Sequence, residues 1–335
     1  MTAKPKAPQI KRPPVLFDKT QRIHQRISKM LGHTFLAYWN SHSGSVCHSD
    51  VLGLWTVLRG VSAKERRATL FIKSDGGTGS ASLRVVNLLR RNLDHVTAAV
   101  PLECASAATM MALGADEIHM GPLAYLTAVD TSIRHDLSPV DRDNDRVSVS
   151  QDELARVVRL WRDNAGDKTS YEALFGHVHP LVIGAVDRAS SLSIQLCTEI
   201  LSYHMKDAKK ARAISEHLNN SYPSHNYPIT LREAQRIGLH ARELDTTMNA
   251  ELLELNALYS EMGQRAVTDF DEKNHHDNEI INIIEGPGVM VYFQVDKDWH
   301  YRVEERRWVA LNEKSGWRIT ERRRGKMVTD VLHAR

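Results

Sequence analysis

The sequence has few cysteines and no long, uninterrupted hydrophobic segment. Its three cysteines are far apart and include no CxxC pair, which argues against a disulfide scaffold and favours a reducing compartment. The most apolar stretch, 96–115, is interrupted by Pro and Glu and is rich in Ala, Ser and Thr. It therefore predicts a buried strand, turn and helix instead of a membrane span. Because the first residues also lack the basic-then-apolar order of a signal peptide, we expect a cytoplasmic protein.

The chain also lacks a large excess of charge of either sign. Its 335 residues include 44 Lys and Arg against 41 Asp and Glu, a net charge of +3. The basic excess is at the two ends, in a Pro-rich leader (1–20) that we expect to be disordered and in the segment 301–335, which we interpret as carrying a solvated basic tail. A balance of this kind gives no indication of nucleic-acid binding.

Short apolar runs alternate with helical patterns along the first half of the chain. We predict strands at TFLAYWN, ATLFIKS, VTAAVPL and DEIHM, with helices between them. Such alternation with short connections favours a mainly parallel sheet in an α/β domain, to which we assign residues 21–265. The polar stretch DFDEKNHHDNE (269–279) is typical of a linker, and the strands expected after it suggest a small β-rich segment within 266–335.

Two glycines stand between a predicted strand and a predicted helix. Gly76 and Gly77 can bring backbone N–H groups close to a ligand, as a phosphate cradle or an oxyanion hole does. The order Asp-Gly-Gly-Thr-Gly-Ser has no Lys of the phosphate-loop type and the wrong glycine spacing for a dinucleotide site. Phosphate binding is therefore weakly supported.

A serine occupies the next turn of the same kind. Ser106 lies where a strand passes into a helix, and Ala105, Ala107 and Ala108 around it leave room for a substrate backbone. A serine at this point is either a helix N-cap or a nucleophile. The Gly-Gly turn upstream makes the two readings about equally supported.

These stretches, FIKSDGGTGSASLRVVNLLRR and VPLECASAATMMALGADEIHMGPLAYLTAVDTSI, resemble the serine dehydrogenase proteinase family. That family is similar to signal peptide peptidase A and lies within the Clp protease/crotonase fold. The resemblance covers roughly 34–244 and includes SHNYPITLREAQRIGL. It implies a spiral of repeated β-β-α units with a helical extension, and a serine peptidase that acts on peptides or proteins.

The resemblance also implies the roles of individual residues. Ser106 corresponds to the nucleophile, and the backbone near Gly77 and Ala107 corresponds to the oxyanion hole, with Gly76 in the same turn. Ala108 stands where the family usually has Gly, and the extra methyl group could narrow the acyl site or shift the turn. The helical segment 181–205 corresponds to a region of oligomer contacts in relatives, so we expect a homo-oligomer.

The base that would activate the serine is left open by the sequence. The position of the histidine in Clp-type relatives falls near Asp130 and Thr131, neither of which is an obvious base. Lys168 is at a plausible distance for a Ser-Lys pair, although a loop lysine is usually only solvated. His225, bracketed by two prolines that fix its backbone, is narrowly preferred, although it equally fits a turn histidine bonded to backbone.

Three other interpretations compete with an active peptidase. An inactive scaffold or peptide-binding member of the same fold accounts for Ala108 and for the unassigned base. An acyl-CoA enzyme of the crotonase type would use the oxyanion hole without Ser106. A metal site at the H-x-H of His177 and His179, joined by His204 or His217, lacks a recognisable Cys or carboxylate partner, so we predict no metal and no other cofactor.

Overall fold

The computed structural model describes residues 9–130, 132–133, 135–139, 147, 149–150, 153–154, 156–157 and 175–333. The helices are α1 (Phe17–Leu31), α2 (Asp50–Leu58), α3 (Gly79–Asn92), α4 (Ala107–Leu113), α7 (Pro180–Ser202), α8 (Ala208–Asn220), α9 (Leu231–Arg236) and α10 (Thr246–Met262). The strands of the first half are β1 (Thr34–Asn40), β2 (Arg67–Lys73), β3 (His95–Val100), β4 (Glu103–Cys104), β5 (Glu117–Met120), β6 (Tyr125–Leu126), β7 (Ser132–Ile133) and β8 (Val149–Ser150). Those of the second half are β9 (Ala241–Glu243), β10 (Ala266–Asp271), β11 (Asn274–Gly286), β12 (Val289–Arg302), β13 (Arg307–Glu313), β14 (Gly316–Arg323) and β15 (Lys326–Leu332).

One mixed sheet of eleven strands organises the molecule, in the order β15-β14-β12-β11-β1-β2-β3-β5-β9 with β10 beside β11 and β13 beside β12. Its centre is parallel: β1 pairs with β2, β2 with β3, and β3 with β5. These are the four strands that the apolar runs predict, so the parallel α/β interpretation is confirmed. Almost every residue of β1, β2 and β3 is buried, as expected for strands covered on both faces.

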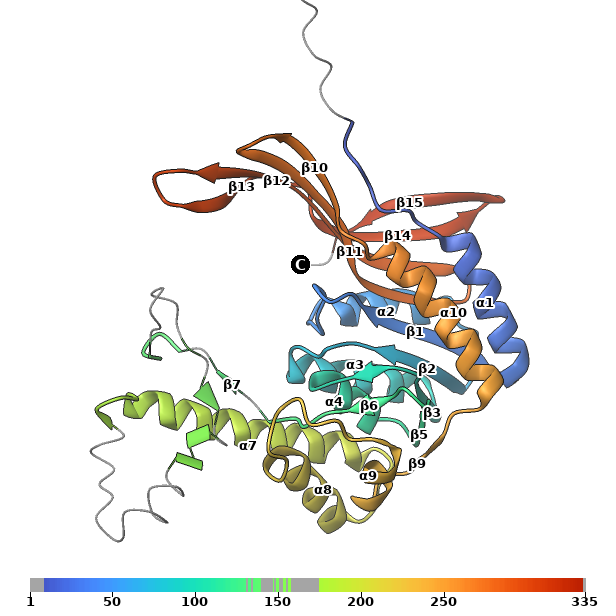
Figure 1. Cartoon of the computed structure of the whole chain (residues 1–335). Coiled ribbons are helices and arrows are strands. Elements are labelled where there is room, and N and C mark those ends of the chain that lie inside the picture. The colour runs from blue at the N-terminus through green and yellow to red at the C-terminus, as the bar shows by residue number, and fades with distance from the viewer. Residues whose placement is uncertain are drawn as a thin grey trace, which may run out of the picture.

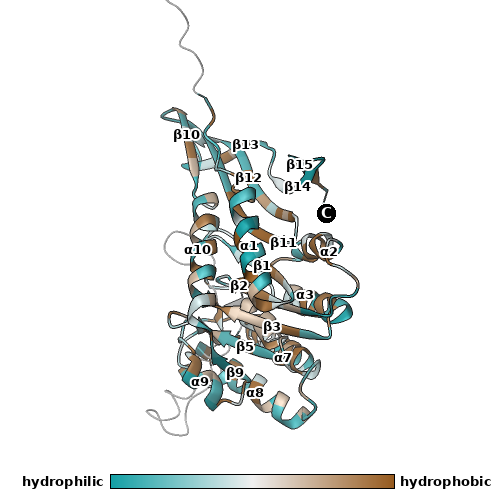
Figure 2. Ribbon diagram, turned by 90° about the vertical axis from the view of Figure 1, so that its right-hand side faces the viewer, coloured by the Kyte–Doolittle hydropathy of each residue, from teal (hydrophilic) through white to brown (hydrophobic). Residues whose placement is uncertain are grey.

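Helices cover the two faces of this sheet (Figure 1). On one face, α1 and α10 pack against alternate strand residues such as Phe35 and Phe71. On the other face, α2, α3, α4 and α7 bury a second cluster that includes Leu36 and Leu70. Figure 2 shows the brown, hydrophobic sides of these helices turned toward the strands. The helices on the second face begin next to the strand ends where the candidate site lies.

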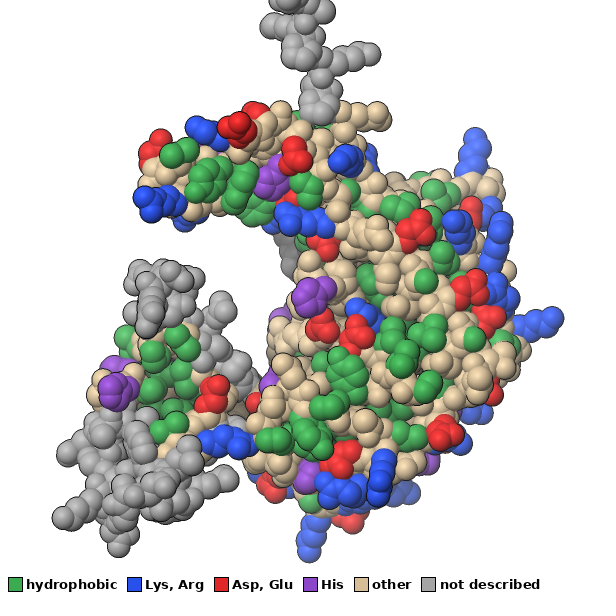
Figure 3. Space-filling model, viewed as in Figure 1, with side chains coloured by type: hydrophobic (Ala, Val, Ile, Leu, Met, Phe, Trp, Pro, Cys, Tyr) green, Lys and Arg blue, Asp and Glu red, His purple; other side chains and the backbone are tan. Residues whose placement is uncertain are grey.

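The predicted linker is wrong, because residues 269–279 form the second half of β10, the turn after it and the beginning of β11. The second half of β11 pairs antiparallel with β1, where Glu285 lies opposite Ala37 and Ile284 lies opposite Tyr38. The C-terminal strands therefore extend the main sheet. The outer parts of β11 and β12, with β10 and β13, project from the body as an arm (Figures 1 and 3). Polar residues tolerate this position because they pair across the strands, as His276 does with Asp298 at 2.8 Å. The last four residues of the run, His276, Asp277, Asn278 and Glu279, are buried, so a run of polar residues did not indicate the absence of a strand.

Two helices bear on the other expectations for the chain. α1 begins at Phe17, inside the range expected to be a disordered leader, and Phe17 is itself buried in the core. α7 exposes Leu181 (61%) and Leu192 (49%) although most of its length is packed. Within the described ranges, no helix is both long and apolar enough to cross a bilayer.

Candidate functional site

The Gly-Gly turn and the Ser106 turn lie side by side at the carboxyl ends of the parallel strands. Ser74 and Cys104 form a parallel bridge, in which the Ser74 N–H donates to the Glu103 carbonyl at 3.1 Å and the Ala105 N–H to the Ser74 carbonyl at 2.9 Å. A Cβ added at Gly76 would lie 2.7 Å from the Cβ of Ser106. The two sequence features therefore form one site, as the sequence interpretation requires.

Ser106 has a backbone conformation that a simple capping residue does not need. Its φ is +51° and its ψ −116°, in a region that residues with a side chain seldom occupy. The Ser106 N–H donates to the Thr127 hydroxyl at 2.8 Å, which holds the turn. The Ser106 hydroxyl makes no capping hydrogen bond to α4, so the N-cap reading is wrong. Backbone strain of this kind costs about 1–3 kcal/mol and is concentrated at functional sites.

Two backbone N–H groups next to this serine are without a partner. Ala107 is the first residue of α4, and Gly77 has a positive φ of +145°. Within the described residues, neither N–H donates a hydrogen bond. Both belong to turns that lie against each other, so both are available to a negatively charged oxygen formed beside Ser106.

The loop before α2 fixes the backbone of Gly77. The Val46 N–H donates to the Gly76 carbonyl at 2.7 Å, and the Thr78 N–H donates to the Val46 carbonyl at 2.8 Å. Val46 therefore forms a short parallel bridge with Gly77, and a Cβ at Gly77 would lie 2.4 Å from the Val46 carbonyl oxygen. Only glycine fits between the loop and the turn.

Asp50, a fully buried carboxylate, holds that loop in place. It accepts hydrogen bonds from the Tyr38 hydroxyl at 2.6 Å, the Cys47 N–H at 2.7 Å and the Asn282 side-chain amide at 3.0 Å. Burial raises the pKa of Asp50, and these donors counteract part of that rise. No local pattern in the sequence indicated this support, because its members come from β1, the loop, α2 and β11.

His225 is the predicted base that the structure brings to Ser106. Both residues line one cavity of about 390 Å³. The His225 Nδ1 lies 2.8 Å from a carboxylate oxygen of Asp130, whose side chain is only 17% exposed. This hydrogen bond and the charge of Asp130 raise the pKa of His225 against an opposing effect of burial. With Nδ1 bonded to Asp130, Nε2 is left for a proton transfer.

Asp130, which bonds to His225, is the candidate site residue that sequence reasoning missed. From the sequence, Asp130 is a candidate only for the base of Ser106, and an aspartate is not an obvious base for a serine. The segments that carry the acid and the histidine are joined by paired hydrogen bonds between Leu126 and Ile229, at 3.0 and 2.8 Å. Asp130 is further held through its neighbour Val129, whose carbonyl accepts from the Ser193 hydroxyl at 2.6 Å. The detectable signal was an acid and a histidine 95 residues apart, which only the fold brings together.

The structure bears differently on the other residues that the sequence assigns to this site. Lys168 lies outside the described residues. Ala108 is completely buried and does not line the cavity, so its methyl group packs into the core and does not narrow the space beside Ser106. Among the described residues, the Ser106 hydroxyl and His225 share the cavity without a hydrogen bond between them. Catalytic hydrogen bonds are often long in an unliganded protein.

Apolar side chains form much of the cavity wall. They come from α4 and α7 and include Met110, Leu192 and Leu196. Gly79 widens the space, because a Cβ there would lie 2.9 Å from the sulfur of Met110. The cavity can therefore hold an apolar side chain next to Ser106.

The histidines considered as metal ligands are placed elsewhere. His179 caps α7, where its Nδ1 accepts from the Leu181 N–H at 3.2 Å, and His204 bonds to the Leu113 carbonyl at 2.9 Å. Over the part of the chain that the structure describes, no three His, Cys, Asp or Glu side chains are grouped for a metal ion.

Comparison with known proteins gives sequence relatives without an assigned function. No protein-family model matches the chain. The uncharacterized protein MJ0137 of Methanocaldococcus jannaschii is 26% identical over 217 residues, which are 64% of this chain and 67% of that protein. The uncharacterized protein MJ1495 of the same organism is 25% identical over 190 residues, 57% of this chain and only 56% of that protein.

Solved structures that resemble this chain are peptidases. A mutant of the 1510-N membrane-bound stomatin-specific protease aligns with a TM-score of 0.39 and 13% identity, over 69% of this chain and 86% of that one. A second mutant, in complex with a substrate peptide, gives a TM-score of 0.38 and 14% identity over 68% and 81%. ClpP1 from Listeria monocytogenes gives 0.36 and 12% over 70% and 99%. At these values the likeness concerns the course of the chain and says nothing of the chemistry at Ser106.

Proposed function

We propose that this protein is a serine peptidase of the serine dehydrogenase proteinase type that hydrolyses peptide bonds with Ser106, His225 and Asp130. The observation that carries the proposal is that a strained serine and a carboxylate-bonded histidine line the same cavity. A capping serine needs no strained backbone, and a turn histidine needs no such partner. Their coincidence at the carboxyl ends of parallel strands is expected of an acyl-transfer site.

In the first step, the Ser106 oxygen attacks the peptide carbonyl while His225 Nε2 accepts the hydroxyl proton. Asp130 keeps the other ring proton on Nδ1 and stabilises the imidazolium that forms. The carbonyl oxygen becomes an anion and accepts hydrogen bonds from the N–H groups of Gly77 and Ala107. His225 then gives its proton to the leaving amine, and an acyl-Ser106 ester remains.

In the second step, water replaces the amine. His225 takes a proton from the water, the hydroxide adds to the acyl carbon, and the same N–H groups bind the second oxyanion. Collapse of this intermediate releases the acid, and the proton returns to Ser106. The apolar wall of Met110, Leu192 and Leu196 favours a substrate with an apolar side chain at the scissile bond.

Self-assembly and a cytoplasmic location belong to the same proposal. The exposed Leu181 and Leu192 on α7 support a homo-oligomer, because a peptidase cavity beside an exposed apolar helix is shielded when copies associate. The three cysteines, Cys47, Cys104 and Cys197, are all free thiols, which fits a reducing compartment.

Labelling with a fluorophosphonate probe tests the proposal. We expect the full-length protein to be labelled, Ser106→Ala to lose the label, and Ser80→Ala, a serine that lines the same cavity, to keep it. His225→Gln should reduce the labelling rate strongly, whereas Lys168→Met should leave it unchanged. Labelling that survives Ser106→Ala would assign the reaction to another residue. A folded protein that is never labelled would favour an inactive, peptide-binding scaffold.

A further inference from the structure

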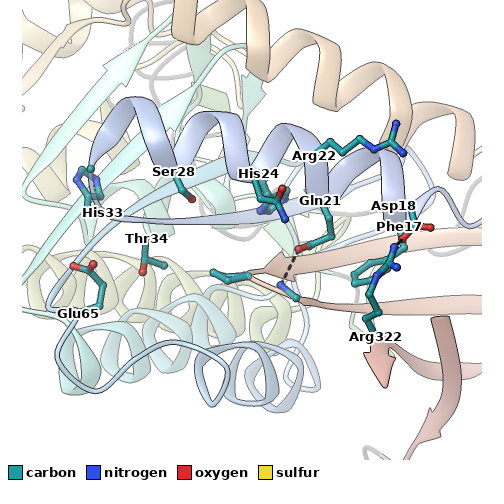
Figure 4. Close-up of a pocket in the computed structure, with 14 residues that line it drawn as sticks. Phe17, Asp18, Gln21, Arg22, His24, Ser28, His33, Thr34, Glu65 and Arg322 are labelled. Carbon is teal, nitrogen blue, oxygen red and sulfur yellow. Dashed lines mark hydrogen bonds and ion pairs between the residues drawn. The ribbon is translucent and has the colours of Figure 1, made fainter. Parts of the chain in front are cut away.

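A second cavity, of about 710 Å³, lies along α1 and away from Ser106 (Figure 4). It is bounded by α1, by the residues that lead into β1, by the turn between β11 and β12, and by β14. Thr34, which lines it, begins β1, whereas Ser106 lies beyond the opposite ends of the parallel strands. We call this cavity the α1 groove. Nothing in the proposed peptidase mechanism uses it.

The α1 groove carries opposite charge at its two ends. Figure 4 shows Asp18, Arg22 and Arg322 toward one end, and His33 and Glu65 at the other. Asp18 and Arg322 form an ion pair, whereas Arg22 has no ion-pair partner among the described residues, so this end has one uncompensated positive charge. Glu65 likewise has no ion-pair partner among them. Burial and the neighbouring Arg67 lower the pKa of His33, and Glu65 is the acidic side chain that lines this end.

Between these ends, the wall of the groove contains a buried hydrogen-bond acceptor without a donor. His24 is 2% exposed, its Nε2 lies 3.0 Å from the Tyr259 hydroxyl, and that hydroxyl donates to Glu285 at 2.7 Å. The Tyr259 proton is therefore engaged, and His24 must donate from Nε2, which leaves its Nδ1 as an acceptor. Burial lowers the pKa of His24 to about 3, so the ring is neutral. Within the described residues, Nδ1 has no hydrogen-bond partner.

We propose that the α1 groove binds a short peptide with free termini, whose carboxylate lies near Arg22 and whose amino group lies near Glu65. A peptide matches the groove because it combines charges of opposite sign at its ends with backbone N–H donors in the part that passes His24. Arg22 lies nine positions before Leu31, the last residue of α1, which is about 14 Å along the helix. An extended peptide of about four or five residues spans that distance.

Calorimetric titration of tetra-alanine into full-length Ser106→Ala protein tests this assignment without the risk of hydrolysis. We expect saturable binding that Arg22→Gln or Glu65→Gln weakens by up to about fivefold, since one screened ion pair contributes up to about 1 kcal/mol. Lys29→Gln is the matched control, because Lys29 is an exposed cation of α1 that does not line the groove, and it should leave the affinity within about twofold.

Tetra-alanine with an acetylated amino end and an amidated carboxyl end provides the second arm. It keeps the backbone donors and loses both charges, so we expect it to bind at least about tenfold more weakly than the free peptide. Binding that is unaffected by Arg22→Gln and Glu65→Gln takes place elsewhere, for example in the Ser106 cavity, and overturns the proposal. Equal binding of the blocked peptide, or no binding of tetra-alanine at millimolar concentration, overturns it as well. Because the readout is binding to a Ser106 variant, failure of the peptidase proposal would not change it.

Discussion

Replacing Gly77 by Ala tests whether the loop before α2 sets the geometry of the oxyanion hole. The new Cβ would lie 2.4 Å from the Val46 carbonyl oxygen and 2.6 Å from the Val46 nitrogen, so the backbone must move. Movement breaks the two hydrogen bonds of Val46, at about 1 kcal/mol each. The backbone conformation at φ +145° adds about 1–3 kcal/mol for a residue with a side chain. We therefore expect Gly77→Ala to lower the free energy of unfolding by about 3–5 kcal/mol.

Gly325→Ala is the matched control for this experiment. Gly325 also has a positive φ, +78°, but a Cβ there meets nothing within 4 Å, so only the backbone cost remains. The assays are unfolding in denaturant and hydrolysis of a fluorogenic peptide at a temperature where both variants are folded. Loss of one oxyanion donor should lower kcat about 10²- to 10³-fold in Gly77→Ala, with kcat unchanged in Gly325→Ala. Equal stability losses in the two variants, or full kcat in Gly77→Ala, would refute the reasoning.

Three further predictions follow from the buried and paired groups. A general base must be neutral and Asp130 raises the pKa of His225, so the acid limb of kcat/KM should lie above pH 6.5. Asp130→Asn should move this limb to lower pH and reduce kcat about 10²- to 10⁴-fold. A limb that does not move in the pH–rate profile of this variant would contradict the prediction. Ser106→Ala should abolish hydrolysis and change the free energy of unfolding by less than about 0.5 kcal/mol, because the hydroxyl makes no capping hydrogen bond. A larger decrease in the free energy of unfolding, measured in denaturant, would indicate a structural role for the hydroxyl. Burial raises the pKa of Glu285 to about 7, so the folded state binds this proton more tightly than the unfolded state. The stability of the wild type should therefore fall, relative to that of Glu285→Gln, by at most about 3 kcal/mol as the pH rises from about 4.5 to 7. If thermal unfolding shows the same dependence of stability on pH for both proteins, the prediction is wrong.

The central sheet was predictable because its strands are buried on both faces. Runs such as TFLAYWN and ATLFIKS are nearly continuous in apolar residues, and the helical patterns between them require crossover connections. The C-terminal half of the sheet was not predictable in the same way. β10 and the outer part of β11 pair charged, amide and histidine residues across the strands, so their composition resembles a linker. The pairing of β11 with β1 joins residues more than 200 positions apart, and no local pattern encodes it.

The candidate site was predictable to the extent that it depends on backbone turns. Gly76 and Gly77 are recognisable because a turn that approaches another backbone excludes side chains, and Ser106 is recognisable from its small neighbours. Asp50 and Asp130 were not recognisable, because a carboxylate in a sequence looks the same whether it is solvated or receives several hydrogen bonds inside the protein. Their roles depend on partners from other elements, such as Asn282 for Asp50 and His225 for Asp130.

The chain order of the proposed triad explains why the base was difficult to assign. The resemblance considered in the sequence analysis implies a histidine near position 130, where this chain has Asp130. The structure has the histidine on the second of two segments that the Leu126–Ile229 hydrogen bonds join into one unit. Proton transfer requires only that an imidazole reaches both the serine and a carboxylate, so two paired segments can exchange the acid and the histidine without changing the chemistry. A search for a base at one fixed distance from Ser106 therefore fails, whereas a search for an acid–histidine pair facing the Ser106 cavity identifies Asp130 and His225 together.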